Sequence, residues 1–477
     1  MSAAASTQTR SDMIRLLALV GYIYQSATAI VLIFAVSHIL LPAHYTSFSL
    51  ALASSQLLCV LMFEWLQLAG VRFLAAAKGE DAAKLRFSLF AAALLSAFAL
   101  ISFGGVASLA STLALRVVIL GLALSVLQGF TDMSFMVIRV SGRLGTAAIL
   151  LILRASLLLA GAVTGALLYG TTEATLFGIL CGQIAALVAG LIIHRTPLRK
   201  VSRQTMLADW ANFCRYGMLA AGASVIHLSV PVMIRFIVIS KLGAAGLAAS
   251  AGFSMAIDLM QRPFAVLVAA IHTVNYPEVI VAFEHGSPND AKQVAARLFE
   301  FVICATVVML GGLIAFLPDA GRLFVPPDIL EGFLVAAPMA AVFYFLHTHL
   351  QATLAVIPHL KKSAVRLVVV AACQFVIVSV FSAAAVALNL PSSNVLAGAA
   401  IATAVVMLFA SGPIVRFGAV PRWSLVATAS VAALLIGSLC AVPSQPQIWL
   451  LGKIVFSAIA TALVAWRGNF LMSARRG

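Results

Sequence analysis

Charged residues are scarce in this 477-residue sequence: Asp, Glu, Lys and Arg together make up 9%, whereas 63% of the residues are hydrophobic. A soluble domain is typically about 25% charged and about half apolar. A folded globule has too little interior to bury this much apolar surface, so most of the chain must be dissolved in a lipid bilayer. This composition excludes soluble enzymes, nucleic-acid-binding modules, secreted disulfide scaffolds and disordered proteins.

Sequence signatures of covalent chemistry are also missing. The six cysteines occur singly, without CxxC or Cys/His spacing, and they are interpreted as packing residues. The sequence has no G-x-x-x-x-G-K-[ST] phosphate loop, no H-E-x-x-H and no G-x-S-x-G. We therefore predict that the protein is not an enzyme and has neither a cofactor nor a metal site.

Acidic residues are half as numerous as basic ones, which gives a formal net charge of +15. In a membrane protein, Lys and Arg gather in cytoplasmic loops. We therefore interpret the surplus as an indicator of membrane topology and predict no nucleic-acid partner. Basic residues fall in every second predicted loop, a pattern that places both termini in the cytoplasm.

Long apolar runs dominate the chain. Fourteen of them, from Leu16–Leu41 to Ile448–Trp466, approach or exceed the length of about 20 residues that a membrane-spanning helix needs. The first run is longer than a signal-peptide core of about 7–15 residues and should remain as a membrane anchor. The predicted fold is an all-α polytopic membrane protein with about 14 transmembrane helices.

Two similar polar segments, Lys78–Lys84 and His285–Lys292, follow the second and eighth predicted helices. Both contain Gly, end in Asp, Ala and Lys, and precede an apolar run with Phe. They indicate two pseudo-symmetric six-helix lobes with a cavity between them, over residues 1–203 and 204–416. Residues 417–477 add a helix pair and a basic tail. Chance similarity between low-complexity segments is the alternative explanation.

Six ionisable residues lie inside the apolar runs, where each costs about 2.5–3.5 kcal/mol on insertion scales, so they should face a hydrated interior. They are Glu64, Asp132, Arg154, Arg235, Asp258 and Arg262. Arg154 and Arg235 have no acidic residue within one helical turn. Isolated guanidinium groups suit phosphate, and snorkelling to the membrane surface is the alternative role.

Asp258 and Arg262 are spaced i,i+4 and share one helix face. They form either a structural ion pair or a cavity wall in which Arg262 meets an anion and Asp258 takes a proton or Na⁺. For Glu64 and Asp132, helix packing competes with ion coupling. His347 and His349, spaced i,i+2, face different sides and are predicted to hydrogen-bond neighbouring helices.

Several short segments resemble polysaccharide flippases, the exporters of lipid-carrier-linked O-antigen and exopolysaccharide units in the multidrug/oligosaccharidyl-lipid/polysaccharide (MOP) superfamily. The matching segments are 37–45 (SHILLPAHY), 70–73 (GVRF), 139–154, 235–243 and 276–278 (YPE). Two positions depart from the family, which commonly has Arg where His38 stands and Asp where Ile234 stands.

The resemblance implies transport of an undecaprenyl-diphosphate-linked oligosaccharide to the outer leaflet of a bacterial inner membrane by alternating access, for lipopolysaccharide or exopolysaccharide biosynthesis. Expected partners are this lipid-linked oligosaccharide, membrane lipids, a polysaccharide polymerase and chain-length regulators. The expected substrate-binding residues are Arg154, Arg262, Arg235, Arg72 and His38, and the expected H⁺- or Na⁺-coupling residues are Asp258, Glu64 and Asp132. A multidrug exporter, a polymerase or ligase, and a non-transporting assembly component remain alternatives.

Overall fold

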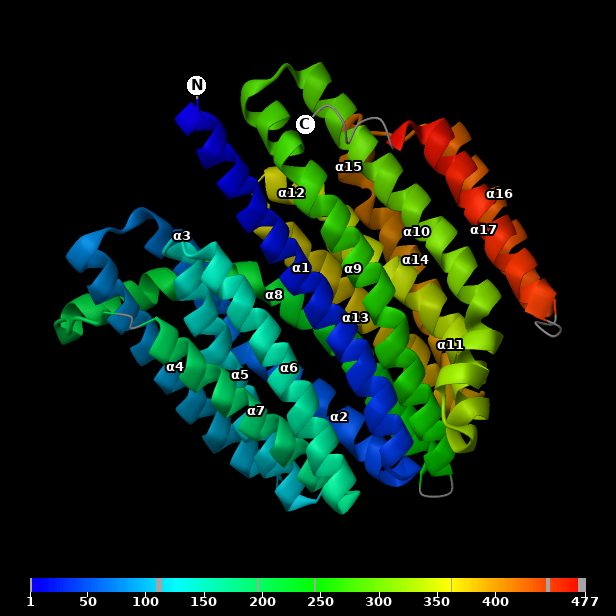
Figure 1. Ribbon diagram of the computed structural model, residues 1–477, viewed down its shortest axis with the longest axis horizontal. Coiled ribbons are helices and arrows are strands. Elements are labelled where there is room, and N and C mark those ends of the chain that lie inside the picture. Colours follow the sequence, from blue (N-terminus) through cyan, green and yellow to red (C-terminus); the bar gives the residue numbers. More distant parts are fainter. Residues whose placement is uncertain are drawn as a thin grey trace. The chain divides into compact units, whose positions relative to one another are not determined.

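The computed structural model describes residues 2–108, 114–194, 197–243, 246–361, 363–442 and 447–470. These parts consist of helices and the turns between them, and fourteen helical stretches are long and apolar enough to cross a membrane (Figure 1). The prediction of an all-α chain with about 14 transmembrane helices is therefore confirmed. The predicted basic tail beyond residue 470 lies outside the described residues.

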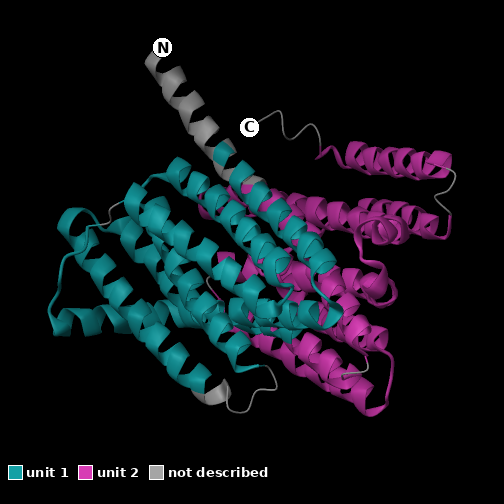
Figure 2. Cartoon of the chain, turned by 60° about the horizontal axis from the view of Figure 1, so that its bottom comes forward, with its two compact units in different colours: residues 1–232 teal, residues 233–477 magenta. Residues whose placement is uncertain are grey.

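The chain divides into two compact units, residues 1–232 and 233–477, shown in separate colours in Figure 2. Unit 1 contains α1 (Ser2–Ile39), α2 (Pro42–Cys59), η1 (Val60–Glu64), α3 (Trp65–Ala76), α4 (Gly79–Ser108), α5 (Leu115–Val140), α6 (Leu144–Tyr169), α7 (Thr172–Ile193) and most of α8 (Arg203–Leu242).

Unit 2 begins in the last turns of α8. It continues with α9 (Leu247–His285), α10 (Pro288–Phe324), α11 (Pro327–Thr348), η3 (His349–Thr353), α12 (Val356–Leu360), α13 (Ala364–Ala387), α14 (Ser392–Ala410), α15 (Gly412–Phe417), α16 (Trp423–Ser438), η4 (Leu439–Ala441) and α17 (Gln447–Gly468).

The division between the units falls inside α8, whereas the predicted lobe boundary at residue 203 coincides with the start of this helix. The first turns of α8 are fixed to α4: Ser88 donates a hydrogen bond to Asp209 over 2.6 Å, and Trp210 donates to the Ser88 carbonyl over 2.9 Å. These contacts explain why most of α8 is compact with unit 1. The three-part division into residues 1–203, 204–416 and 417–477 stays a prediction.

Helix boundaries follow local sequence signals. Ser287 and Asp290 form a capping box at the start of α10, in which each side chain accepts a hydrogen bond from the other residue's backbone N–H. Thr171 caps α7 in a similar way by accepting from the backbone of Ala174. Gly170 ends α6 with φ of 63°, a left-handed conformation that glycine adopts at little cost.

In unit 1, α6 packs closely on α7, and α1 packs on α6. The α6–α7 interface is tight because glycines face each other: a Cβ built on Gly161 would overlap the carbonyl oxygen of Gly178, and the reverse holds too. Such small residues let helix backbones approach closely in a membrane, where association depends on packing.

In unit 2, α9 packs on α11, and α16 packs on α10. The helix pair α16–α17 is held to α10 by apolar contacts that include Cys304, Leu425 and Ile436. An ion pair adds to this attachment, since the buried Lys453 of α17 contacts Asp319 of α10 over 3.0 Å.

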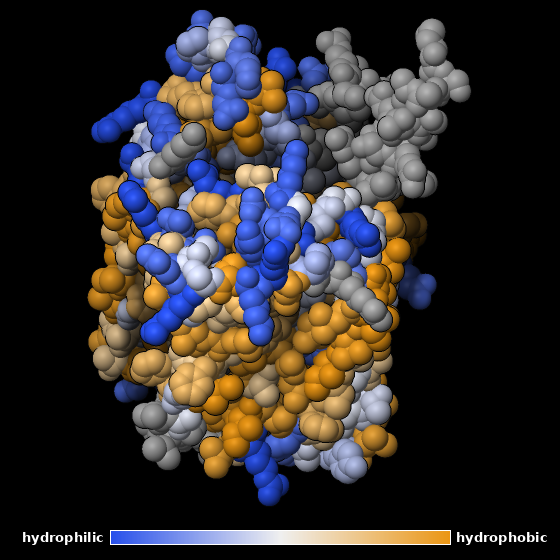
Figure 3. Space-filling model, turned by 90° about the vertical axis from the view of Figure 1, so that its left-hand side faces the viewer, coloured by the Kyte–Doolittle hydropathy of each residue, from blue (hydrophilic) through white to orange (hydrophobic). Residues whose placement is uncertain are grey.

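Apolar side chains cover much of the surface. Phe98 of α4 is 70% exposed and Phe409 of α14 is 78% exposed. On the face drawn in Figure 3, hydrophilic side chains gather toward one end and hydrophobic side chains cover much of the remainder. This distribution is the one expected of helices that face lipid along most of their length.

Candidate functional site

A buried arginine links three helices of unit 1. Arg154 of α6 forms an ion pair with Asp132 of α5, and its Nε donates to Gln183 Oε1 of α7 over 3.2 Å. The Arg154 side chain is 7% exposed and that of Asp132 is 28% exposed. Two guanidinium nitrogens are thus engaged, and Nη2 has no hydrogen-bond partner among the described residues. The arginine is buried, while its carboxylate partner reaches an opening.

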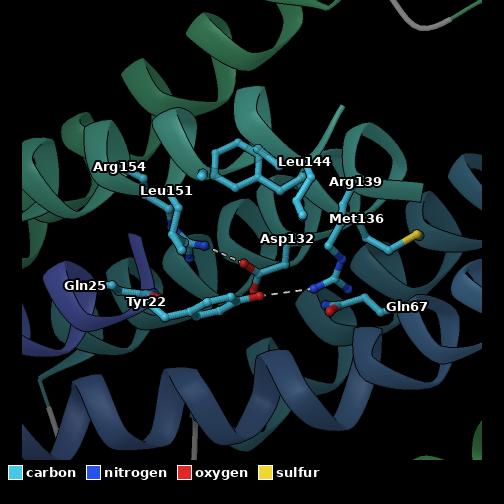
Figure 4. A pocket seen from close by; sticks show the side chains of 12 residues that line it. Tyr22, Gln25, Gln67, Asp132, Met136, Arg139, Leu144, Leu151 and Arg154 are labelled. Atoms are coloured by element: carbon cyan, nitrogen blue, oxygen red, sulfur yellow. Dashed lines mark hydrogen bonds and ion pairs between the residues drawn. The ribbon is translucent and has the colours of Figure 1, made fainter. Parts of the chain in front are cut away.

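That opening is a cavity of about 200 Å³ inside unit 1, lined by both polar and apolar side chains (Figure 4). Besides Asp132 and Arg154, its polar lining consists of Tyr22 and Gln25 of α1, Gln67 of α3 and Arg139 of α5. Arg139 donates to the Tyr22 hydroxyl over 3.2 Å. The volume holds several water molecules or a small ion, and it is smaller than the roughly 300–1,000 Å³ of pockets for drug-sized ligands.

The second cluster lies in unit 2. Arg235 of α8 is 3% exposed and donates through Nη2 to Asp258 Oδ1 of α9 over 2.7 Å. Arg262, one turn after Asp258 on the same helix, has a buried Nε without a hydrogen-bond partner in the described part of the chain. All three charged groups lie close enough to Tyr344 of α11 to interact electrostatically with its hydroxyl. Two arginines therefore share the neighbourhood of one carboxylate.

The structure corrects the inference that Arg154 and Arg235 are unpaired. Each has a carboxylate partner on an adjacent helix, 22 residues away for Arg154 and 23 residues away for Arg235. A search within one helical turn misses such partners because they meet only when neighbouring helices pack. Asp258, considered above as an i,i+4 partner of Arg262, is paired with Arg235 instead.

The other predicted site residues contact residues outside these two clusters. The exposed Arg72 stacks on Tyr216, with its guanidinium carbon 4.6 Å from the ring centroid. His38 is exposed and its Nδ1 lies 2.8 Å from the carbonyl oxygen of Phe34 in its own helix. Glu64 ends η1 and is within hydrogen-bond reach of Ser224 in α8.

Glu64 differs from the two aspartates because it has no Lys or Arg partner among the described residues. It also lies at a π-helical turn, a local widening of the helix that is frequent at functional sites. These features bear on which acid can exchange a proton or cation.

Polar residues that were not predicted as site residues from the sequence complete the clusters. Gln25, Gln67 and Gln183 supply neutral groups around the unit 1 cavity or its arginine. A glutamine in an apolar run carries no charge, so only its position next to Arg154 or Asp132 marks it. The signal available in the sequence was an amide side chain in the middle of an apolar run, because a buried amide in a membrane also requires a hydrogen-bond partner.

The two histidines were predicted correctly as interhelical hydrogen bonders. His347 accepts from Gln374 of α13 over 2.9 Å, and His349 Nε2 lies 2.8 Å from the Thr306 hydroxyl of α10. Within the described residues, no group of three or more His, Cys, Asp or Glu side chains is placed to hold a metal ion.

Comparison with solved structures identifies the fold. The chain superposes on "Lipid II flippase MurJ, inward closed conformation" with a TM-score of 0.70 and 13% identity, over 96% of this chain and 100% of that one. An inward-facing multidrug resistance MATE family transporter of the MOP superfamily gives 0.63 at 14% identity, over 82% and 94%. No protein-family model and no curated protein sequence matches.

A third structure is that of a MOP superfamily transporter from Pyrococcus furiosus with a binding pocket of reverse polarity. It aligns with a TM-score of 0.54 and 13% identity, over 84% of this chain and 94% of that one. All three structures are transporters of one fold. The chain therefore has the MOP fold, in which the described helices place two charged clusters.

Proposed function

We propose that the protein is a transporter that moves a lipid-linked oligosaccharide with a diphosphate head group across the membrane by alternating access. The expected setting is surface polysaccharide biosynthesis at a bacterial inner membrane, with both termini in the cytoplasm. The fold supports transport, and the likeness to a lipid II flippase over 96% of the chain supports a lipid-linked substrate.

The surplus of arginine in both clusters is the observation that carries the choice of an anionic substrate. In unit 1, Arg139 and Arg154 line one cavity with Asp132. In unit 2, Arg235 and Arg262 lie near Asp258. Each cluster has one more cationic than anionic group, and guanidinium is well suited to bind phosphate oxygens through paired donors.

The two clusters have different parts in this proposal. The unit 1 cavity is too small for a diphosphate with its sugars, so Arg154 contributes positive charge at a distance or through Nη2. Arg262 in unit 2 has a buried nitrogen without a partner in the described part of the chain, and it is the stronger candidate for direct phosphate contact. Arg235, Arg72 and His38 have partners already and are assigned secondary roles.

For coupling to an H⁺ or Na⁺ gradient, we propose Glu64 before Asp258 and Asp132. Both aspartates are neutralised by arginines that they contact, so protonation of either would leave a buried cation uncompensated. Glu64 has Ser224 within hydrogen-bond reach and lacks a described basic partner, so it can change its charge without breaking an ion pair.

A transporter of cationic drugs is the alternative that the MATE likeness raises. Positive clusters disfavour it, because a like charge brought into a site of low dielectric is repelled strongly. A polymerase or ligase would usually need a larger external loop or soluble domain to hold its catalytic groups, and a non-transporting assembly component would not need the buried charges.

Purified protein in liposomes tests the proposal. A fluorescent prenyl-diphosphate oligosaccharide is incorporated in both leaflets, and dithionite bleaches only the outer one. We expect the protein to raise the bleached fraction from about half to nearly all, because lipids in the inner leaflet become accessible. The same fluorophore on phosphatidylcholine should stay half bleached. Equal bleaching of both lipids, or no effect on either, would contradict the proposal.

Variants locate the site within the same assay. Arg262→Gln should slow bleaching at least about tenfold, since a charge-assisted hydrogen bond to phosphate contributes about 1.5–3 kcal/mol. Arg366→Gln is the matched control, because it removes an equal charge from an exposed position at the start of α13. Uptake of a cationic dye in place of the lipid would support the drug exporter instead.

A further inference from the structure

A second, larger pocket lies at one end of the unit 1 helices. Its volume is about 630 Å³, and it is lined by Arg86, Ser141, Arg143, Ile192, Ile193, His194 and Pro197. Arg86 lies in the second turn of α4, Ser141 and Arg143 form the turn between α5 and α6, and His194 follows the end of α7. Four of the helices that are long and apolar enough to span a membrane therefore begin or end around this pocket.

Positive charge dominates the pocket, whose lining contains two arginines, one histidine and no carboxylate. The Arg86 Nε is buried and has no hydrogen-bond partner among the described residues, and its Nη2 makes only a long contact of 3.5 Å with Ser141 Oγ. A buried donor of this kind costs free energy until an acceptor arrives.

His194 reports on the same electrostatic environment. Burial lowers the pKa of its imidazole, and the nearby Arg143 and Arg86 lower it further. The two arginines thus lie close enough to disfavour a positive charge on His194, and they supply the positive charge of the pocket. An anion between them would be attracted by this charge and would supply the acceptor that the Arg86 Nε lacks.

The remaining wall of the pocket indicates the kind of anion. Ile192 is 72% exposed and Ile193 is 48% exposed, at the end of a membrane-spanning helix. A ligand in this place meets guanidinium groups on one side and an apolar, lipid-facing surface on the other. Basic pockets between transmembrane helices at the membrane surface suit lipid head groups.

We propose that the Arg86–Arg143–His194 pocket binds the phosphate of an anionic membrane lipid. The phosphate lies between the two guanidinium groups and accepts hydrogen bonds from them and from Ser141, while the acyl chains follow the apolar surface of α7 past Ile192. This site is separate from the Asp132 cavity of the same unit, and lipid binding is measurable without any transport.

The test compares binding of short-chain phosphatidylglycerol and short-chain phosphatidylcholine to the purified full-length protein, by native mass spectrometry. About 0.5 M salt limits unspecific attraction, because charges more than about 4 Å apart are then largely screened. We expect phosphatidylglycerol to bind at least about tenfold more tightly. Equal binding of the two lipids would overturn the proposal.

The decisive variant is Arg86→Gln/Arg143→Gln, which should remove the preference for phosphatidylglycerol. Lys78→Gln/Lys200→Gln is the matched control, since it removes the same charge from exposed positions next to the neighbouring helix ends. An equal loss in both double variants would indicate general charge attraction and overturn the proposal. Arg143 alone is exposed, so Arg143→Gln keeps the test informative if the double variant does not fold.

Inorganic phosphate and pyrophosphate distinguish a lipid from a soluble anion. Added to the phosphatidylglycerol titration at the same concentration as the lipid, they should compete weakly, because they lack the chains that contact α7. If either of them displaces the lipid completely at an equal concentration, the pocket is a site for a free anion and the lipid assignment is wrong.

Discussion

Removing the carboxylate of Asp132 should destabilise unit 1 strongly. In Asp132→Asn the Arg154 guanidinium, with a side chain only 7% exposed, loses its ionic partner. Breaking a buried pair by removing one partner typically costs 3–5 kcal/mol, and we expect about 3 kcal/mol here, because water in the adjoining cavity compensates part of the loss. The free energy of unfolding in mixed micelles measures this.

A double variant separates the structural role of the pair from the role of Arg154 in transport. Asp132→Asn/Arg154→Met removes both charges, so its loss of stability should be smaller than the sum of the single losses by about 2 kcal/mol. Transport of the diphosphate lipid should remain low if Arg154 provides positive charge to the substrate. Full transport by the double variant would show that Arg154 serves only packing.

An exposed pair provides the control for these measurements. Asp81 and Lys84 lie 3.5 Å apart near the start of α4, with side chains 83% and 41% exposed. Asp81→Asn should cost less than about 1 kcal/mol, as exposed ion pairs generally do. If Asp132→Asn costs no more than Asp81→Asn, or if the single losses simply add in the double variant, the argument from burial is refuted.

Three further predictions concern stability. Gly161→Val should destabilise the protein by at least about 2 kcal/mol, because the valine side chain would overlap the α7 backbone at Gly178. Gly312→Ala should be neutral or stabilising, because its added methyl group meets nothing within 4 Å. Equal effects of the two substitutions on thermal unfolding would contradict the packing argument. Glu300→Gln should loosen the start of α16 and lower the unfolding temperature. The buried Glu300 accepts hydrogen bonds from the backbone N–H, Nε and Nη2 of Arg422, and these bonds raise the pKa of Arg422. Arg416→Gln, which removes an exposed charge nearby, should leave the unfolding temperature unchanged. Burial, Arg143 and Arg86 lower the pKa of His194, so folding favours its neutral form. The stability of the lipid-free protein should therefore fall as the pH drops below the unfolded pKa of about 6.5. His194→Gln should weaken this pH dependence, and an unchanged pH profile in the variant would contradict the argument.

The number and type of helices were predictable from sequence because a bilayer imposes one requirement on every span. About 20 apolar residues in a row have few folded alternatives to a transmembrane helix, and the runs ending near Leu41 and beginning near Ile448 both became helices. Pro42 at the start of α2 and the Ser287–Asp290 capping box mark their helix boundaries in the sequence itself.

The pairing of charges was not predictable, because it depends on which helix faces lie against each other. Arg154 and Arg235 are separated from their aspartates by 22 and 23 residues, and the two members of each pair lie on consecutive helices. Apolar runs without strong periodicity do not reveal which face is inward. The sequence therefore indicated which residues belong inside, and only packing determined their partners.

The paired arginines change what an anion-binding site in this fold requires. A guanidinium that already contacts a carboxylate, such as that of Arg235, is partly neutralised by it, and a phosphate must compete with the carboxylate for its N–H donors. Arg262 has no such competitor in the described part of the chain, yet its Nε is shielded from water. Transport by this chain should therefore be far more sensitive to Arg262→Gln than to Arg235→Gln once the latter is stabilised by Asp258→Asn. Equal sensitivity of the two arginines would place the phosphate on the Arg235–Asp258 pair instead.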